Sequence, residues 1–155
     1  MLMFLVYIGE NRFAIESELI VEVVPRVILK KLSHVPPYVA GMLNYGGMPI
    51  PVVDLCYLLE EREARSSMHT RILLFKFKEI DREYQIGFIA EKITQTITQK
   101  RSDFIDSQVR IREVPYLDGI LTDEEGVIQF IDAQELFQTV KGVLFEQAQV
   151  TYEKT

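Results

Sequence analysis

Few side chains in this sequence could carry catalytic or metal-binding chemistry, and they stand far apart. Cys56 is the only cysteine, and His34 and His69 are the only histidines. A structural zinc site takes about four Cys, His or carboxylate ligands at short, regular spacings, so no metal site is expected. Cys56 and a histidine could act as nucleophile and base, but Cys56 lies in an apolar turn, where a cysteine usually fills space.

Two aspartates, Asp54 and Asp132, follow similar apolar runs and invite comparison with an aspartic-protease dyad. No Asp-Thr-Gly or Asp-Ser-Gly loop is present, and no Gly-x-Ser-x-Gly elbow, Walker loop or Gly-x-Gly-x-x-Gly occurs. Each aspartate precedes a short helical turn, so we expect both to be N-caps, and Glu135 has the capping-box spacing from Asp132. We therefore predict a protein that has no catalytic residues, is not an enzyme and uses no cofactor.

The composition argues against several further classes of protein. Because 48% of the residues are apolar, the chain can bury a core and is not expected to be disordered. The formal net charge of −6 argues against nucleic-acid binding, which needs clustered positive charge. The apolar residues 1–8 are too few for a membrane span or a signal peptide and predict a buried strand, so no membrane insertion is expected. A lone cysteine fits the reducing cytoplasm.

An internal repeat is the most informative feature. Residues 37–59 and 115–137 align without a gap at an offset of 78 positions, with 7 of 23 positions identical. Upstream of each copy lie an apolar run, a polar turn and two further extended segments. Each unit is thus predicted as two strands, an extended segment, a hairpin and a helical turn, which indicates small barrels or a sandwich.

The repeat also fixes the expected organisation. The units span residues 3–59 and 72–137, with a polar connector at 60–70, a surface loop at 99–113 and a helical tail at 138–155. In the first hairpin, residues 44–47 (Asn-Tyr-Gly-Gly) tolerate positive φ and predict a tight turn. Pro49 and Pro51 lack backbone N–H groups on one edge of their strand, so that edge cannot be fully paired.

Residues 36–55, which contain Pro-Tyr-Val-Ala-Gly followed by Asn-Tyr-Gly-Gly and Pro-Val-Val-Asp-Leu, resemble the signature of CheW-like coupling domains. Residues 20–24 (Ile-Val-Glu-Val-Val) are similar to the family's Val-x-Glu-Val strand, and residues 87–93 and 115–137 are similar to its later half. The resemblance implies a single all-β domain over residues 1–155, made of two pseudo-twofold-related five-stranded SH3-like barrels. Short helices, a C-terminal helix and strands exchanged between the halves are also implied.

The function implied by the resemblance is a non-enzymatic adaptor in bacterial chemotaxis signal transduction. Such a scaffold couples the cytoplasmic tip of methyl-accepting receptors to the regulatory domain of a CheA-type histidine kinase. It is cytoplasmic and recruited to membrane receptor arrays. Residues 70–74 and 89–91 are also similar to coupling proteins of Wsp-type surface-sensing systems.

The resemblance also implies partner-binding residues. Ile20, Glu22 and Val23 match the strand that borders the receptor-binding groove, Gly41 matches a glycine at a close backbone approach, and Asn44 matches the turn asparagine. Gly46 stands where the family has arginine, so the bidentate contacts of a guanidinium are lost. Ile20 and Val23 could equally be core residues.

Two other functions stay open at this stage. Small barrels often bind nucleic acid through a basic groove with aromatic side chains, although the acidic balance opposes this. The second open function is that of a diverged scaffold of the same family without kinase coupling, since glycine replaces the family's arginine at position 46.

Overall fold

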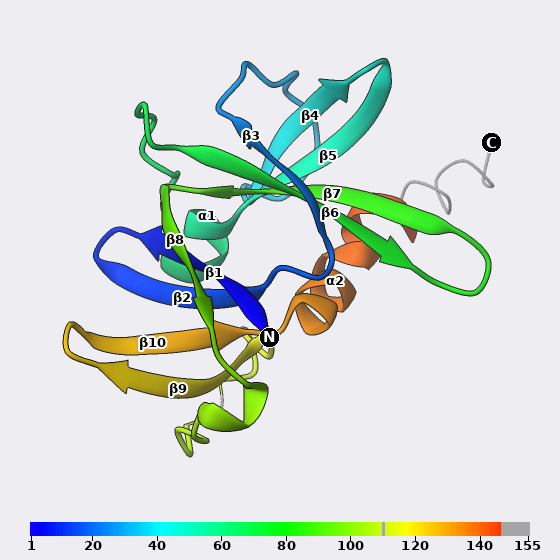
Figure 1. The fold of residues 1–155 in the computed structure, drawn as a ribbon. Coiled ribbons are helices and arrows are strands. Elements are labelled where there is room, and N and C mark those ends of the chain that lie inside the picture. Colours follow the sequence, from blue (N-terminus) through cyan, green and yellow to red (C-terminus); the bar gives the residue numbers. More distant parts are fainter. Residues whose placement is uncertain (110, 147–155) are drawn as a thin grey trace.

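The computed structural model describes residues 1–109 and 111–146, and within them ten strands form two five-stranded sheets (Figure 1). The strands are β1 Leu2–Ile8, β2 Asn11–Glu16, β3 Ile20–Pro25, β4 Val39–Tyr45, β5 Met48–Asp54, β6 Arg71–Lys78, β7 Glu83–Ala90, β8 Lys92–Thr98, β9 Leu117–Asp123 and β10 Gly126–Ile131. The helices are α1 Leu55–Glu60, η1 Arg101–Asp103, α2 Ala133–Lys141 and η2 Gly142–Glu146. The predicted all-β class with short helices is confirmed. Positions 147–155 of the predicted tail lie outside the described residues.

The two sheets have the same topology. Sheet A has the strand order β8-β1-β2-β10-β9, and sheet B has the order β3-β6-β7-β5-β4. Replacing every strand of sheet A by its counterpart in the repeat gives the order of sheet B. Each sheet therefore takes the first two strands of one repeat unit and the last three of the other, and neither unit contains a complete sheet.

A parallel strand pair joins the two units inside each sheet. In sheet B, β5 pairs with β7 from Val52 to Asp54 only. Pro49 and Pro51 precede this ladder. At their positions β5 pairs with β4 and not with β7. The prediction that their edge is not fully paired is confirmed, because a proline there interrupts no hydrogen bond.

Aromatic side chains of sheet B and the C-terminal helix form the centre of the main core. Phe77 stacks on Phe137 of α2 with ring centroids 4.4 Å apart, and Phe75 meets Phe88 edge-on at 5.4 Å. All four side chains are at most 1% exposed. Stacked and edge-on aromatic pairs add about 0.5–1.5 kcal/mol each beyond their buried area, so the first pair holds α2 against β6 and the second holds β6 against β7.

The two repeat-related aspartates make the same contacts. Asp54 Oδ1 accepts from the backbone N–H of Cys56, and Asp132 Oδ1 accepts from Gln134, so both predicted N-caps are confirmed. The Asp132 backbone N–H donates to the Tyr116 carbonyl at 2.8 Å rather than to Glu135. The capping box is therefore incomplete, because a neighbouring segment already occupies that donor.

The predicted surface loop at 99–113 is partly ordered by the core. It contains η1, and Phe104 is only 9% exposed against Phe130, at a ring distance of 5.3 Å. Ile105 pairs with Ile120 of β9 in an isolated bridge. The sequence prediction was wrong for Phe104, since this side chain is buried in a second apolar cluster together with Phe130.

Candidate functional site

All six residues predicted to bind partners lie on sheet B. Ile20, Glu22 and Val23 belong to β3, Gly41 and Asn44 belong to β4, and Gly46 lies in the turn to β5. In strand order β3 and β4 are the two edges of that sheet, yet Glu22 reaches Tyr45 at the end of β4. The structure thus relates the Glu22 strand to the end of β4 that precedes the turn with Gly46.

Strand β3 has three half-buried side chains, Ile20, Val23 and Val24, and three exposed ones, Val21, Glu22 and Pro25. Ile20 and Val23 are half-buried and pack against the main core. Val21 is 55% exposed, and Glu22 is exposed beside it. A register shift between Ile20 and Glu22 in the ladder with β6 interrupts the simple alternation of this strand. Val21 and Glu22 are therefore adjacent exposed residues of this strand, and Val21 was not singled out in the sequence.

Glu22 perturbs the phenol next to the turn. The Glu22 carboxylate lies within hydrogen-bonding reach of the Tyr45 hydroxyl and raises the pKa of that phenol, with smaller contributions from desolvation and from the carboxylate charge. A neutral Tyr45 hydroxyl can donate to Glu22, and this favours the protonated phenol. Glu22 of β3 thus acts on a phenol at the end of β4, next to the turn that holds Gly46.

Gly41 is required by a contact within the chain itself. A Cβ at this position would lie 2.4 Å from the carbonyl oxygen of Lys30, and the glycine has a φ of +146°. Lys30 and Met42 exchange two backbone hydrogen bonds of 3.0 and 2.8 Å. The close backbone approach expected at Gly41 is present, and its neighbour is residues 26–32, here called the strap.

The turn at residues 44–47 has the predicted geometry. Gly46 and Gly47 have φ values of +58° and +89°, and Asn44 Oδ1 accepts from the Gly47 N–H at 2.9 Å. These angles are typical of a hairpin turn with two positive-φ residues. A Cβ at Gly46 would meet nothing within 4 Å, so a larger side chain has space but not the favoured backbone angle.

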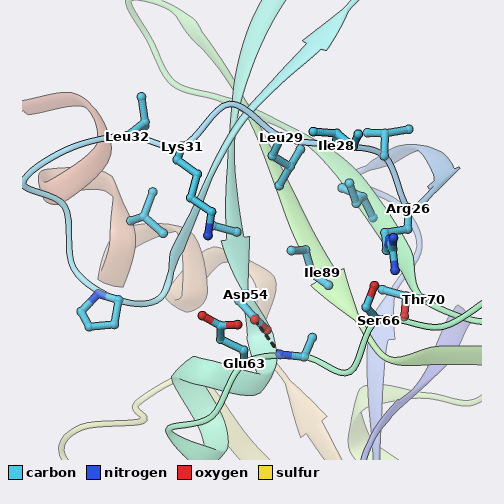
Figure 2. A pocket seen from close by; sticks show the side chains of 16 residues that line it. Arg26, Ile28, Leu29, Lys31, Leu32, Asp54, Glu63, Ser66, Thr70 and Ile89 are labelled. Atoms are coloured by element: carbon cyan, nitrogen blue, oxygen red, sulfur yellow. Dashed lines mark hydrogen bonds between the residues drawn. The ribbon is translucent and has the colours of Figure 1, made fainter.

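A cavity of about 420 Å³ lies beneath the strap (Figure 2). Its lining includes Leu29 of the strap, Val39 and Ile89 from β4 and β7, and Ala64 of the connector (residues 60–70). Asp54 also lines it, and the second oxygen of its carboxylate accepts from the Ala64 N–H at 2.8 Å. Burial raises the Asp54 pKa, while three backbone N–H groups oppose that shift.

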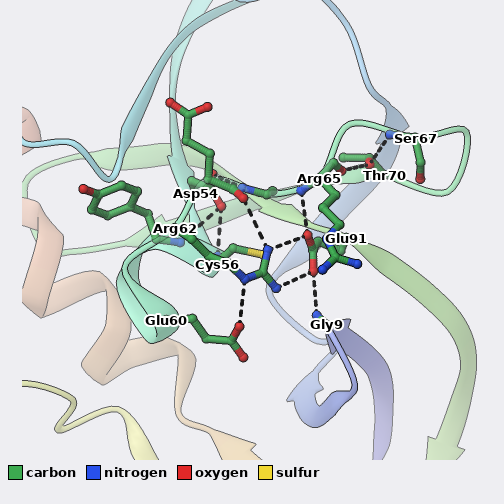
Figure 3. A network of polar contacts seen from close by, with 12 residues as sticks. Gly9, Asp54, Cys56, Glu60, Arg62, Arg65, Ser67, Thr70 and Glu91 are labelled. Carbon is green, nitrogen blue, oxygen red and sulfur yellow. Dashed lines mark hydrogen bonds and ion pairs between the residues drawn. The ribbon is translucent and has the colours of Figure 1, made fainter.

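The connector is held by a polar network around Glu91 (Figure 3). Glu91 accepts from the Arg62 guanidinium at 2.9 Å through both oxygens, from the Arg65 N–H at 2.6 Å and from the Gly9 N–H at 2.5 Å. These donors, Arg62 first, lower the Glu91 pKa to about 2 against the effect of burial. Glu91 stands between β7 of sheet B and β8 of sheet A, so one carboxylate fastens both sheets to the connector.

Sequence reasoning missed this network and a second ion pair. Arg12 of β2 is 6% exposed and binds both oxygens of Asp123 at the end of β9, and this contact lowers the Asp123 pKa to about 2. Two sequence signals could have revealed these contacts. Arg12 is a single arginine in an apolar strand, and Glu91 is a glutamate directly after an apolar strand. Both charges needed partners that only the fold identifies.

The other residues considered for catalysis or metal binding do not form such a site in the part of the chain that the structure describes. Cys56 is buried, and burial raises the pKa of its thiol, so it has no thiolate character. Among residues 1–109 and 111–146, no three His, Cys, Asp or Glu side chains are grouped as metal ligands. No helix in that part of the chain is long and apolar enough to cross a membrane.

Comparison with known proteins finds a matching family and similar sequences. The model of the CheW-like domain family matches residues 2–141. The chain is 29% identical to Protein FrzA of Myxococcus xanthus over 56% of its own length, and it spans only 51% of that relative. It is 26% identical to Chemotaxis protein CheW of Bacillus subtilis (strain 168) over 66% of its own length and 65% of that relative.

A solved structure has the same fold. The crystal structure of the scaffolding protein TtCheW from Thermoanaerobacter tengcongensis superposes with a TM-score of 0.72 at 19% identity, over 84% of this chain and 82% of that one. The family match covers both repeat units and α2, and the solved scaffold shares the fold. The chain therefore belongs to the CheW-like domain family.

Proposed function

We propose that this protein is a non-enzymatic coupling protein of a bacterial chemosensory system. It joins methyl-accepting receptors, through their cytoplasmic tips, to the regulatory domain of a CheA-type histidine kinase. The match of the CheW-like family to residues 2–141 carries this proposal. It acts in the cytoplasm and is recruited to receptor arrays; membership of a Wsp-type system is a narrower form of the same proposal.

The face formed by β3 and the β4–β5 turn supports a binding role. Val21 and Met48 are 55% and 51% exposed, and Glu22 and Asn44 are exposed polar neighbours. Protein interfaces commonly combine apolar anchors with a charged or polar rim. Ile20 and Val23 pack on the main core beneath β3, Gly41 lies against the strap, and Gly46 leaves the tip of the turn without a side chain.

Binding assays with separate partners test the proposal. The purified chain is mixed with the regulatory domain of the CheA-type kinase from the same organism and, separately, with a receptor cytoplasmic fragment. We expect both to bind, and Glu22→Lys to weaken one of them at least tenfold while unfolding at the wild-type temperature. Thr94→Lys, on the exposed β8 of the other sheet, is the matched control and should bind as the wild type does. Binding to the receptor fragment alone would support a scaffold without kinase coupling.

A further inference from the structure

We propose that the cavity beneath the strap is a docking site for a short acidic segment of a partner protein. In this arrangement one large apolar side chain enters the cavity, and a flanking carboxylate meets Arg26 and Lys31. The site is distinct from the β3 and hairpin face and goes beyond the coupling function proposed above.

The cavity has the size and lining for an apolar side chain. Its volume of about 420 Å³ lies within the range of about 300–1,000 Å³ typical of ligand pockets. Val39 and Ile72 in the lining are 7% and 1% exposed, and Ala40 and Ile89 are half-buried. An entering leucine or phenylalanine would remove this apolar surface from water.

Apolar side chains also surround the entrance. Ile28 is 98% exposed, Val27 is 41% exposed and Leu32 is 37% exposed, and all three line the cavity. Grouped exposed apolar residues beside a cavity, rimmed by polar ones, mark interaction sites more often than isolated exposed residues do. The strap thus presents more apolar surface than its own packing requires.

The charge distribution selects an acidic partner. Residues 23–53 contain Arg26, Lys30 and Lys31 and no Asp or Glu, whereas the rest of the chain carries all 23 acidic residues against 14 basic ones. Arg26 and Lys31 line the cavity, and neither forms an ion pair with a described residue. Figure 2 shows Lys31 extending from the strap toward the cavity. A basic strap on an acidic protein favours an acidic flank along the strap and disfavours a basic one.

The carboxylates of the site itself determine the orientation of the bound segment. Asp54 lies at the base of the cavity and has its oxygens occupied by the N–H groups of Cys56, Tyr57 and Ala64. Glu63 is exposed on the connector side. Both repel a carboxylate, so the acidic flank must lie along the strap while the apolar side chain occupies the centre.

Nucleic acid is the less favoured occupant. None of the side chains that line the cavity is aromatic, so unpaired bases have no stacking platform there. Glu63 adds a negative charge to the same rim. A peptide needs only the apolar cavity and the basic strap.

A titration with a defined peptide tests the site. The isotope-labelled full chain is titrated with acetyl-Asp-Glu-Leu-Phe-Glu-Asp-amide, and the amide resonances are followed by NMR. We expect shifts concentrated at residues 27–32 and 63–66 and no saturable shifts with a peptide in which lysine replaces the four acidic residues. The double variant Arg26→Glu/Lys31→Glu should lose at least tenfold in affinity. Glu63→Gln should gain about two- to threefold, since it removes a like charge.

A neighbouring lysine provides the matched control. Lys30 carries the same charge on the same strap but does not line the cavity, so Lys30→Glu should change the affinity less than threefold. Thermal unfolding verifies that each variant is folded. The proposal is overturned if Lys30→Glu weakens binding as much as the double variant or if the lysine peptide binds equally well. Competition by a single-stranded oligonucleotide, or concentration-dependent shifts of the same amides without peptide, would likewise overturn it.

Discussion

The Arg62 guanidinium donates two hydrogen bonds to the Glu91 carboxylate, both with N···O distances of 2.9 Å. Arg62 belongs to the connector, and Glu91 stands where the chain passes from sheet B to sheet A. Because Glu91 is only 8% exposed and also accepts from Gly9 and Arg65, it is the most constrained carboxylate of this network. The pair therefore ties the connector to the point where the chain passes from one sheet to the other.

Removing the charge of Glu91 should destabilise the fold. Glu91→Gln leaves Arg62 without its buried partner, and we expect the free energy of unfolding to fall by about 2–4 kcal/mol. Urea denaturation followed by circular dichroism measures the change. Glu60→Gln affects the same guanidinium at a more exposed position and should cost less than about 1 kcal/mol. Equal effects of the two variants would show that burial of Glu91 is not the cause.

Stability should also fall in acid through the same residue. The folded-state pKa of Glu91 is about 2, below the value of about 4.3 of an unfolded glutamate, so the folded state binds fewer protons. The contribution of Glu91 is therefore complete above about pH 4.3 and is lost as the pH falls toward 2. Asp54, whose pKa is raised by burial, opposes this trend. Denaturation between pH 5 and 2 should show a shallower decline for Glu91→Gln than for the wild type; identical slopes would exclude this role.

The two glycines of the β4 hairpin should differ in their response to alanine. Gly41→Ala forces a Cβ against the Lys30 carbonyl, so the strap must move, and we expect a loss of at least about 2 kcal/mol. Gly46→Ala meets open space and should cost only about 1 kcal/mol for its positive φ. Thermal unfolding measures both. Equal, small losses would mean that the contact between the strap and β4 yields easily.

Replacing Gly46 by arginine tests whether the missing arginine affects partner binding. Gly46→Arg should fold with a loss of about 1 kcal/mol, since the turn has space for the side chain but a φ of +58°. We expect it to change affinity for a receptor fragment or a CheA-type regulatory domain at least threefold relative to Gly46→Ala. Calorimetric titration of both variants makes the comparison. Matching affinities would remove any binding role for the tip of this turn.

The strands were predictable from the sequence, whereas their partners were not. Each repeat unit has its own apolar runs and turn residues, and these placed both hairpins and the caps at Asp54 and Asp132. Because the two units have the same local pattern, a strand such as β2 fits either copy of its neighbour. The family resemblance implied an exchange of strands between the halves, and the fold identifies β10 of the other unit as the partner of β2.

The site was predictable in part for a similar reason. The resemblance to the family singled out Glu22 and Asn44, and the local residue pattern predicted the tight turn with its two glycines. It could not show that the strap folds back onto Gly41, nor that Arg62 finds Glu91, because both contacts join segments separated by loops. Long-range partners of this kind depend on loop conformation, which residue types alone do not determine.

Reconstitution of a three-component complex tests the coupling function most directly. Membranes that contain the receptor are sedimented with the CheA-type kinase, with and without this protein. We predict that the kinase sediments with the membranes only when the protein is present, and that Glu22→Lys abolishes this effect while Thr94→Lys does not. Kinase sedimentation that does not change when the protein is added, with every component folded, would contradict the proposed function.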